Sequence, residues 1–379
     1  MKKKAALITI YNVPNYGSVL QTFATIKLLE SFGYDIDLIN YNYPNEWHFA
    51  HGFKRYRKSI LKKIIVWFSE KTGLISKHRF KRRLEKFRSK HFPLTCPYFS
   101  LEELSNENWE KYDIVITGSD QVWNPRFLHG DSVFMLSFVP DSIKKISISS
   151  SFACDAIPEN LVVKYSRYLS RYNAITVRER NGLNIIKNQL KLSVESNLLL
   201  DPTLLLSKKD WLRLFNIHLK KVKQKYLLLY ILDYAFDPSP YIYDIAEFFS
   251  KKYDLEIKVI SENKSSAANN LKMNFKFHGG SSPKKFIELF AKASMVITSS
   301  FHGTAFAVNF GIPLISVVPE EKDDRQSSLL RQLSLENNIA HVETNPMNLN
   351  PFFNKPEIES QLYQIRDKNK KTISGILSD

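Results

Sequence analysis

The stretch that decides the fold is SMVITSSFHGTAFAVNFGIPLISVV, residues 294–318. SMVITSS is typical of a short buried strand, and PLISVV is typical of a second one. Between them GTAFAVNFG predicts a helix, with Gly311 and Pro313 as stop signals. A strand, a helix and a strand in this order predict a βαβ unit with parallel strands. His302 lies in the turn where the helix begins.

The turn around His302 has the layout of an anion site. Unpaired backbone N–H groups and the helix dipole both favour negative charge at the start of a helix. We therefore expect the turn residues to bind an anion together with His302; they are Ser299, Ser300, Gly303 and Thr304. On these residues alone, the alternative that His302 only caps the helix stays open.

The same alternation of strands and helices runs along the whole chain. The first half contains AALITIYN, a helix ending at Gly33, DIDLINY, DIVITGSD, KISISSSF, AITVRERNG and LLLDPTLLL as the last strand and its exit. The second half contains KYLLLYIL, EIKVIS, MVITSS and PLISVV. We predict an α/β protein of two Rossmann-like domains facing a cleft. The expected parts are a first domain at 1–206 with a basic insertion at 53–91, a connector at 207–225, a second domain at 226–345 and a tail at 346–379 that packs back on the first domain.

Composition and charge narrow the class of protein. The chain has 379 residues, of which 44% are hydrophobic and 24% are charged, as in folded soluble proteins. Cys96 and Cys154 have neither metal-site spacing nor a disulfide framework. The N-terminal apolar stretch is too short for a signal peptide, and no segment has the length of a membrane span. We expect a cytoplasmic protein.

The net charge of +16 is concentrated between Phe53 and His91, which hold 15 Lys or Arg and two acidic residues. Within this stretch KSILKKIIVWFSEKTGLI interleaves apolar and basic residues, a pattern that suits an anionic membrane surface. It also suits a nucleic acid or an acidic glycan. The alternative is a solvated helical hairpin whose apolar stripe packs on the body. We favour peripheral contact with an anionic membrane and expect no nucleic acid.

Polar residues follow several predicted strands, where α/β sheets bind their ligands. The two turns expected to bind a polyhydroxyl acceptor contain Asn15, Tyr16, Gly17, Ser18 and Gln21, and Ser119, Asp120, Gln121, Trp123 and Asn124. Asp120 is either a general base or a helix cap. Arg178 would hold an anion through two parallel hydrogen bonds, or form a surface ion pair. Lys322 and Arg325 would close over the anion, unless they belong to a solvated loop.

No metal-binding motif, P-loop or GxGxxG fingerprint occurs, which disfavours nucleoside triphosphatases and dinucleotide enzymes, and we expect no metal. The constellation instead describes a transferase that handles a small anion and a polyhydroxyl acceptor.

Six motifs in order give the chain a family resemblance: YNVPNYGSVLQTFA, ITGSDQVWNP, ISISSSF, TVRERNG, LLDPTLLL and SSFHGTAFAVNFGIPLISV. Over roughly residues 5 to 335 the chain resembles the polysaccharide pyruvyl transferases. The resemblance implies a GT-B-like fold with an acceptor-side first domain and a donor-side second domain. It implies phosphoenolpyruvate as co-substrate with no cofactor. The acceptor would be a sugar of a cell-surface glycan (exopolysaccharide or capsule), and the product a cyclic pyruvate ketal.

The resemblance also implies roles for individual residues. His302 would be the general acid/base, Arg178 would hold the donor's carboxylate or phosphate, and the N–H groups of Gly303 and Thr304 would bind the phosphate. Asp120 would orient or deprotonate the acceptor hydroxyl, and Trp123 would stack on its sugar. Many members carry an arginine two residues before the motif histidine, where this chain has Ser300. Lys322 or Arg325 would then supply the missing charge, or the donor would sit differently.

Two other functions stay open. The first is a GT-B-type glycosyltransferase that uses a nucleotide sugar, and the second is a noncatalytic protein that binds acidic polymers through residues 53–91. If the acceptor is lipid-linked, the basic insertion would hold the enzyme at the inner face of the cell membrane.

Overall fold

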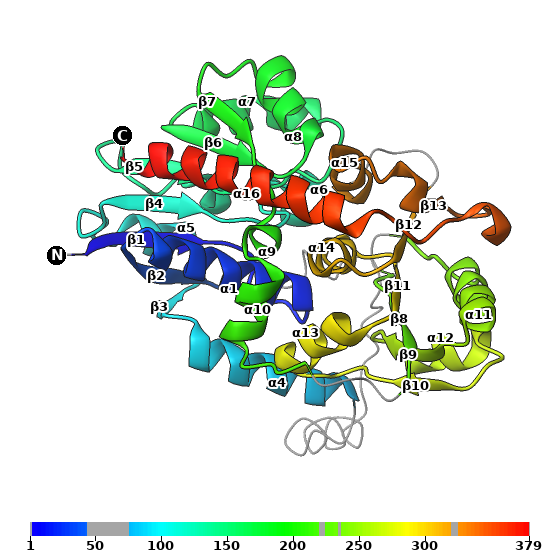
Figure 1. Cartoon of the computed structure of the whole chain (residues 1–379). Coiled ribbons are helices and arrows are strands. Elements are labelled where there is room, and N and C mark those ends of the chain that lie inside the picture. The colour runs from blue at the N-terminus through cyan, green and yellow to red at the C-terminus, as the bar shows by residue number, and fades with distance from the viewer. Residues whose placement is uncertain (1, 44–75, 220–223, 234–235, 320–324, 379) are drawn as a thin grey trace, which may run out of the picture. The chain divides into compact units, whose positions relative to one another are not determined.

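The computed structural model describes residues 2–43, 76–219, 224–233, 236–319 and 325–378. The chain forms two compact units, each with its own parallel sheet and core (Figure 1). The first unit comprises Met1–Arg57, Arg88–Leu205 and Arg366–Asp379, and the second comprises Lys58–Phe87 and Leu206–Ile365.

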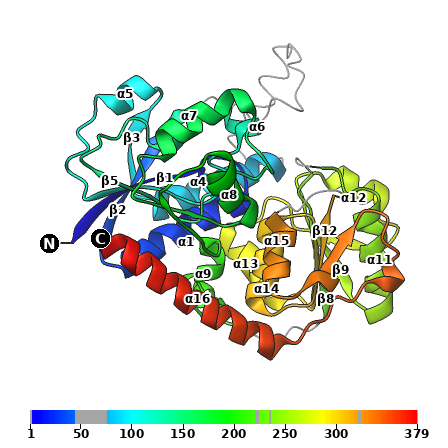
Figure 2. The ribbon, with the colours of Figure 1, turned by 90° about the horizontal axis from the view of Figure 1, so that it is seen from above.

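In the described part of the first unit, seven parallel strands lie in the order β3-β2-β1-β4-β5-β6-β7. They are β1 (Lys3–Ile8), β2 (Tyr34–Tyr41), β3 (Leu94–Tyr98), β4 (Ile114–Thr117), β5 (Lys144–Ser147), β6 (Ala174–Val177) and β7 (Glu195–Leu198). The helices are α1 (Tyr16–Ser31), α5 (Leu101–Ser105), α6 (Pro125–Leu128), α7 (Glu159–Leu169), α8 (Arg180–Asn184) and α9 (Pro202–Leu205), together with the second half of α16 (Lys355–Ser378). Helices α1 and α16 cover one face of this sheet, and α5 and α7 cover the other (Figures 1 and 2).

In the described part of the second unit, six parallel strands lie in the order β10-β9-β8-β11-β12-β13. They are β8 (Tyr226–Tyr230), β9 (Glu256–Ile260), β10 (Phe275–Phe277), β11 (Met295–Thr298), β12 (Leu314–Val318) and β13 (Ile339–His341). Figure 2 shows α11 (Tyr241–Tyr253) and α12 (Lys264–Asn270) on one face and α13 (Pro283–Lys292), α14 (Phe301–Phe310) and α15 (Arg325–Gln332) on the other. In both units the order of the first six strands is the Rossmann order. Successive strands are added on one side of the first strand and then on the other, so the strand order reverses between β1 and β4 in the first sheet and between β8 and β11 in the second.

Several boundaries differ from those predicted. Residues 207–225 are not only a connector, because α10 (Lys208–Leu214) buries Trp211 completely, with its ring 5.2 Å from Phe306. LLLDPTLLL is not a strand beyond its first residue. Strand β7 ends at Leu198, and Asp201 accepts hydrogen bonds from the backbone N–H and hydroxyl of Thr203 and so starts α9. This correction follows from a proline at the first helical position, which favours a helix start.

Three strands were missed by the sequence pattern, namely β3, β10 and β13. Each lies at an edge of its sheet and is largely exposed or half-buried, so it lacks the apolar run on which the prediction relied. The end of the chain belongs to the first unit from Arg366 on. There Asn369 accepts a hydrogen bond from the backbone of Leu200, and the Tyr34 hydroxyl donates to the carbonyl of Leu377.

Of the basic insertion, residues 53–75 lie outside the described part. The rest forms α4 (Ser76–His91), in which Phe80 and Leu84 are buried and Phe87 stacks on Phe215. Its basic side chains at 79, 82 and 86 are exposed. The described helix therefore packs an apolar stripe on the protein and presents a basic face outward.

Candidate functional site

In the second unit, His302 lies at the point where the strand order of the sheet reverses, between β8 and β11. It is the second residue of α14, which follows the central strand β11, and its side chain is buried, with only 6% exposed. The Ser299 hydroxyl donates to the carbonyl of Leu232 and accepts a hydrogen bond from its N–H, at 2.8 and 3.0 Å. The end of β11 is thereby tied to the chain that leaves β8, which fixes the turn before His302.

Helix α14 sits close to the sheet because its third residue is a glycine. A Cβ atom on Gly303 would lie 2.3 Å from Oγ1 of Thr298 and 2.8 Å from a ring carbon of Tyr230. One turn along, the Thr304 hydroxyl lies 2.8 Å from that of Ser316. These contacts set the height and rotation of the helix, and so the position of His302.

Helix α15 brings a positive charge to this region. The guanidinium of Arg325, its first residue, lies 5.8 Å from the centre of the Phe301 ring, immediately before His302. The following residue, Gln326, is buried and donates to the hydroxyl of Ser316, which holds this end of α15 against β12. Lys322, the other cation predicted near the anion, lies outside the described residues.

The predicted phosphate-binding groups of the turn are already used within it. The Gly303 N–H donates to the hydroxyl of Ser300, and the Thr304 N–H donates to the Ser300 carbonyl, at 3.3 and 2.9 Å. The N–H of Ser300 donates to Thr298. In this structure these hydrogen bonds cap the start of α14 and position His302. That Ser299, Ser300, Gly303 and Thr304 bind the anion stays a prediction.

In the first unit, Asp120 occupies the corresponding switch point after β4. Its φ of 75° is unusual for a residue other than glycine. Such a backbone conformation costs on the order of 1–3 kcal/mol and persists only where the surrounding structure enforces it. The carboxylate is nearly buried and accepts hydrogen bonds from the Ser18 hydroxyl at 2.6 Å and the Gln121 N–H at 2.9 Å. Ser18 lies in the first turn of α1, which Asn15 caps through the N–H of Gly17.

Arg178 does not have the position predicted for it. Its side chain is fully buried, and its nitrogens lie 2.8 Å from Asp201, 3.5 Å from Asp120 and 3.8 Å from Glu179. Burial alone lowers the pKa of Arg178, but the three carboxylates together outweigh it and raise the pKa. This corrects the expectation that Arg178 holds the donor's carboxylate or phosphate, because an incoming anion would meet three negative charges around one positive charge.

Most of the residues predicted to bind the acceptor are also internal. Trp123 is 1% exposed; its indole N–H donates to the Phe134 carbonyl and its ring packs on Phe152 and Tyr172. This position is a correction to the stacking role, because no ring face is open to a sugar. Gln21 is fully buried and Tyr16 nearly so. Asn124 caps α6 and donates to the side chain of Gln121.

One arginine of the first unit escaped the sequence prediction. Arg88, from the last turn of α4, donates to the carbonyl of Val13 at 2.7 Å, in the loop between β1 and α1. Burial raises the pKa of Tyr11 to about 12 against the opposing charge of Arg88. Burial also raises the pKa of Tyr43, further increased by the charge of Asp120. In the sequence Arg88 is one of many lysines and arginines between Phe53 and His91. Its position beside the apolar stripe of the helix was the only signal that set it apart.

Comparison with known proteins shows the family of the chain. A family model described as polysaccharide pyruvyl transferase matches residues 15–321. The chain belongs to this family. The match spans both switch-point turns, with Asp120 and His302 inside it. Among curated proteins, none matches the chain.

Solved structures show the GT-B fold. The UDP-bound MnaA protein of S. aureus matches with a TM-score of 0.52 and 11% identity, covering 97% of each chain. A putative UDP-N-acetylglucosamine 2-epimerase of Listeria monocytogenes matches with a TM-score of 0.51 and 11% identity, covering 98% of this chain and 91% of that one. At such identity the likeness shows the fold alone.

Proposed function

We propose that the protein transfers the enolpyruvyl group of phosphoenolpyruvate to a sugar of a cell-surface polysaccharide precursor, where it becomes a cyclic pyruvate ketal. The observation that carries the proposal is the position of His302, buried at the start of the helix that follows the central strand of the second sheet. Family membership supplies the reaction class. The adjacent guanidinium of Arg325 is the cation we assign to the donor in place of an arginine at position 300.

The reaction needs proton transfer to a carbon atom of the donor and from the hydroxyl oxygens of the sugar. His302 donates a proton to the methylene carbon of the enol phosphate, and positive charge develops on the adjacent carbon. One sugar hydroxyl attacks this carbon and loses its proton, and the carbon–oxygen bond to phosphate breaks. A second hydroxyl then attacks the same carbon and closes the ring, and its proton leaves with the phosphate. A histidine suits such transfers near neutral pH. In the first unit, Asp120 is the carboxylate we assign to the acceptor hydroxyl, with Arg178 as its positioning residue.

The test combines turnover with donor binding. Purified protein is incubated with phosphoenolpyruvate and candidate acceptor glycans, and phosphate release and the NMR signal of the ketal methyl group are measured. His302→Gln should lose about 10²–10⁴ in rate, the usual contribution of general acid–base catalysis, while calorimetry still shows donor binding. His218→Gln is the matched control, because His218 is exposed in the same unit.

Binding of a nucleotide sugar without any binding of phosphoenolpyruvate would refute the proposal. It would favour the glycosyltransferase alternative. An unaltered rate in His302→Gln would remove His302 from the mechanism even if the donor binds.

For location, we propose a cytoplasmic protein in peripheral contact with an anionic membrane through residues 53–91. The exposed basic face of α4 supports this. None of the described helices has the length and apolar character of a membrane-spanning segment. Flotation with vesicles containing anionic lipid should weaken when Arg79, Arg82 and Lys86 are all changed to Gln. Equal flotation of this variant and the wild type would exclude α4 as the contact.

A further inference from the structure

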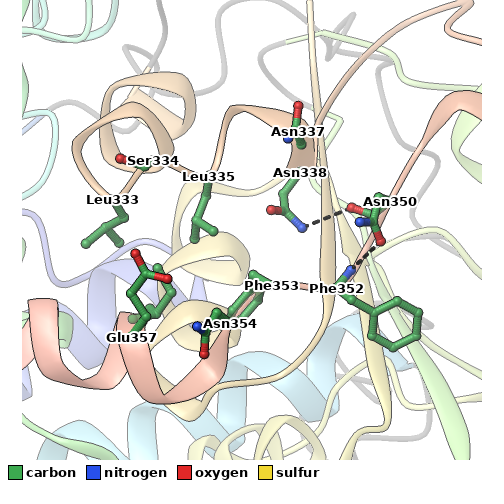
Figure 3. A pocket seen from close by; sticks show the side chains of 11 residues that line it. Leu333, Ser334, Leu335, Asn337, Asn338, Asn350, Phe352, Phe353, Asn354 and Glu357 are labelled. Atoms are coloured by element: carbon green, nitrogen blue, oxygen red, sulfur yellow. Dashed lines mark hydrogen bonds between the residues drawn. The ribbon is translucent and has the colours of Figure 1, made fainter.

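A polar pocket lies in the second unit, away from His302. It is lined by Leu333, Ser334, Leu335, Asn337, Asn338, Asn350, Phe352, Phe353, Asn354, Glu357 and Ile358. Figure 3 shows Glu357 and Asn354 on one side of it and Asn350 and Phe352 on the other.

The pocket and His302 are at opposite ends of the sheet. Asn338 donates to the carbonyl of Leu314, the first residue of β12, whereas His302 follows the last residue of β11. Strands β11 and β12 are parallel neighbours. At about 3.3 Å per residue, the five residues of β12 separate the two places by roughly 15 Å. The pocket is therefore not part of the candidate site described above.

Hydrogen bonds within the protein hold the wall of the pocket in place without a ligand. Asn338 is 2% exposed, and its side-chain amide donates to the carbonyls of Leu314, Asn350 and Pro351 at 3.0–3.2 Å. The Leu314 N–H returns a hydrogen bond to Pro351, and the side chain of Asn350 accepts one from the N–H of Phe352 (Figure 3). These bonds fix the segment before α16 against the start of β12, so ligand binding would order little.

The lining suits a neutral polyhydroxyl compound. The side chains of Ser334, Asn337 and Asn354 make no hydrogen bond within the described part of the chain. Amides and hydroxyls both donate and accept, as sugar hydroxyls do. Phe352, 49% exposed and held edge-to-face by Tyr253, offers an apolar face at the rim. Glu357 is the one ionisable side chain of the lining, so the wall carries negative charge and disfavours an anion.

The size of the pocket limits its occupant. Its volume is about 160 Å³, the scale of one sugar ring rather than a chain. We propose that this pocket is an accessory site for a single neutral sugar unit of a glycan, separate from the place of chemistry. The inference rests on the proposed function, since a glycan acceptor is what brings such a sugar to the protein.

The test measures binding alone, without donor or turnover. Saturation-transfer NMR is recorded with neutral methyl glycosides of common hexoses and N-acetylhexosamines, titrated to the millimolar range where a single ring is expected to bind. Wild type should give saturable binding. The double variant Asn337→Ala/Asn354→Ala should weaken it about tenfold, as the loss of two hydrogen-bonding amides predicts.

Asn274→Ala is the matched control, because Asn274 is exposed in the same unit and lines no part of the pocket. His302→Gln should also bind normally. The proposal is overturned if no glycoside binds saturably, or if the double variant binds as well as Asn274→Ala, which would place the sugar elsewhere. Because phosphoenolpyruvate is absent, failure of the proposed function would leave this result untouched.

Discussion

Replacing Arg178 by Met tests the corrected role of this arginine. The substitution keeps most of the buried volume but removes the cation that lies 2.8 Å from Asp201, 3.5 Å from Asp120 and 3.8 Å from Glu179. Removing one partner of a buried ion pair costs about 3–5 kcal/mol, because the remaining charge is left uncompensated. Several carboxylates depend on this one guanidinium, so we expect the upper part of that range.

The sign of the pH dependence gives a second measurement. Without the cation, burial and mutual repulsion disfavour the charged form of these carboxylates, so we expect them to bind protons more readily in the folded variant than in the unfolded chain. Where the folded state binds more protons, stability falls as pH rises, so the loss should be larger at pH 7 than at pH 5. Neutralising one carboxylate in Arg178→Met/Asp201→Asn should restore part of the stability.

Denaturant and thermal unfolding measure both effects, with the transition of the first unit expected to fall by about 10 °C. Arg213→Met is the control, because Arg213 pairs with Asp210 while 73% exposed and should contribute less than about 1 kcal/mol. The reasoning is refuted if Arg178→Met unfolds like Arg213→Met at both pH values. Loss of phosphoenolpyruvate binding at unchanged stability would restore Arg178 to the anion site.

Five further substitutions, with Gly375→Ala as a control, test the packing that positions His302 and the core of the first unit. Gly303→Ala should destabilise the second unit by about 1–3 kcal/mol through overpacking against Thr298 and Tyr230. Gly375→Ala, in an open position on α16, should be neutral or slightly stabilising in the same unfolding experiment. Ser300→Ala should cost about 1 kcal/mol in denaturant unfolding by removing the cap of α14. Ser300→Arg should cost more, since it also places a charge at a position only 2% exposed; wild-type stability in this variant would contradict the assigned cap. Trp123→Ala should cost about 3–5 kcal/mol as a core truncation, and a change in glycan affinity without loss of stability would instead support the stacking role.

The division of the fold into strands and helices was largely readable from local pattern. The central strands carry continuous apolar runs because both faces of a parallel sheet are covered. Such runs can be recognised as buried strands from the sequence alone. The edge strands β3, β10 and β13 were missed for the same reason, since exposure removes the run. The positions of Asp120 and His302 after central strands also followed from the sequence, because turns at strand ends carry the polar residues that face ligands.

By itself the sequence determined the two-sheet architecture, the family and the turns that hold Asp120 and His302. Only the tertiary structure decided what each polar residue of those turns contacts. Arg178 looks identical in sequence whether it faces an incoming anion or three carboxylates of its own chain, since Asp120 and Asp201 reach it from other strands. Trp123 likewise turned inward to its core, and Arg88 reached the first turn from a distant helix. Local pattern records which residues are polar, whereas contacts between residues far apart in the chain decide whether that polarity is used inside the protein or left for a ligand.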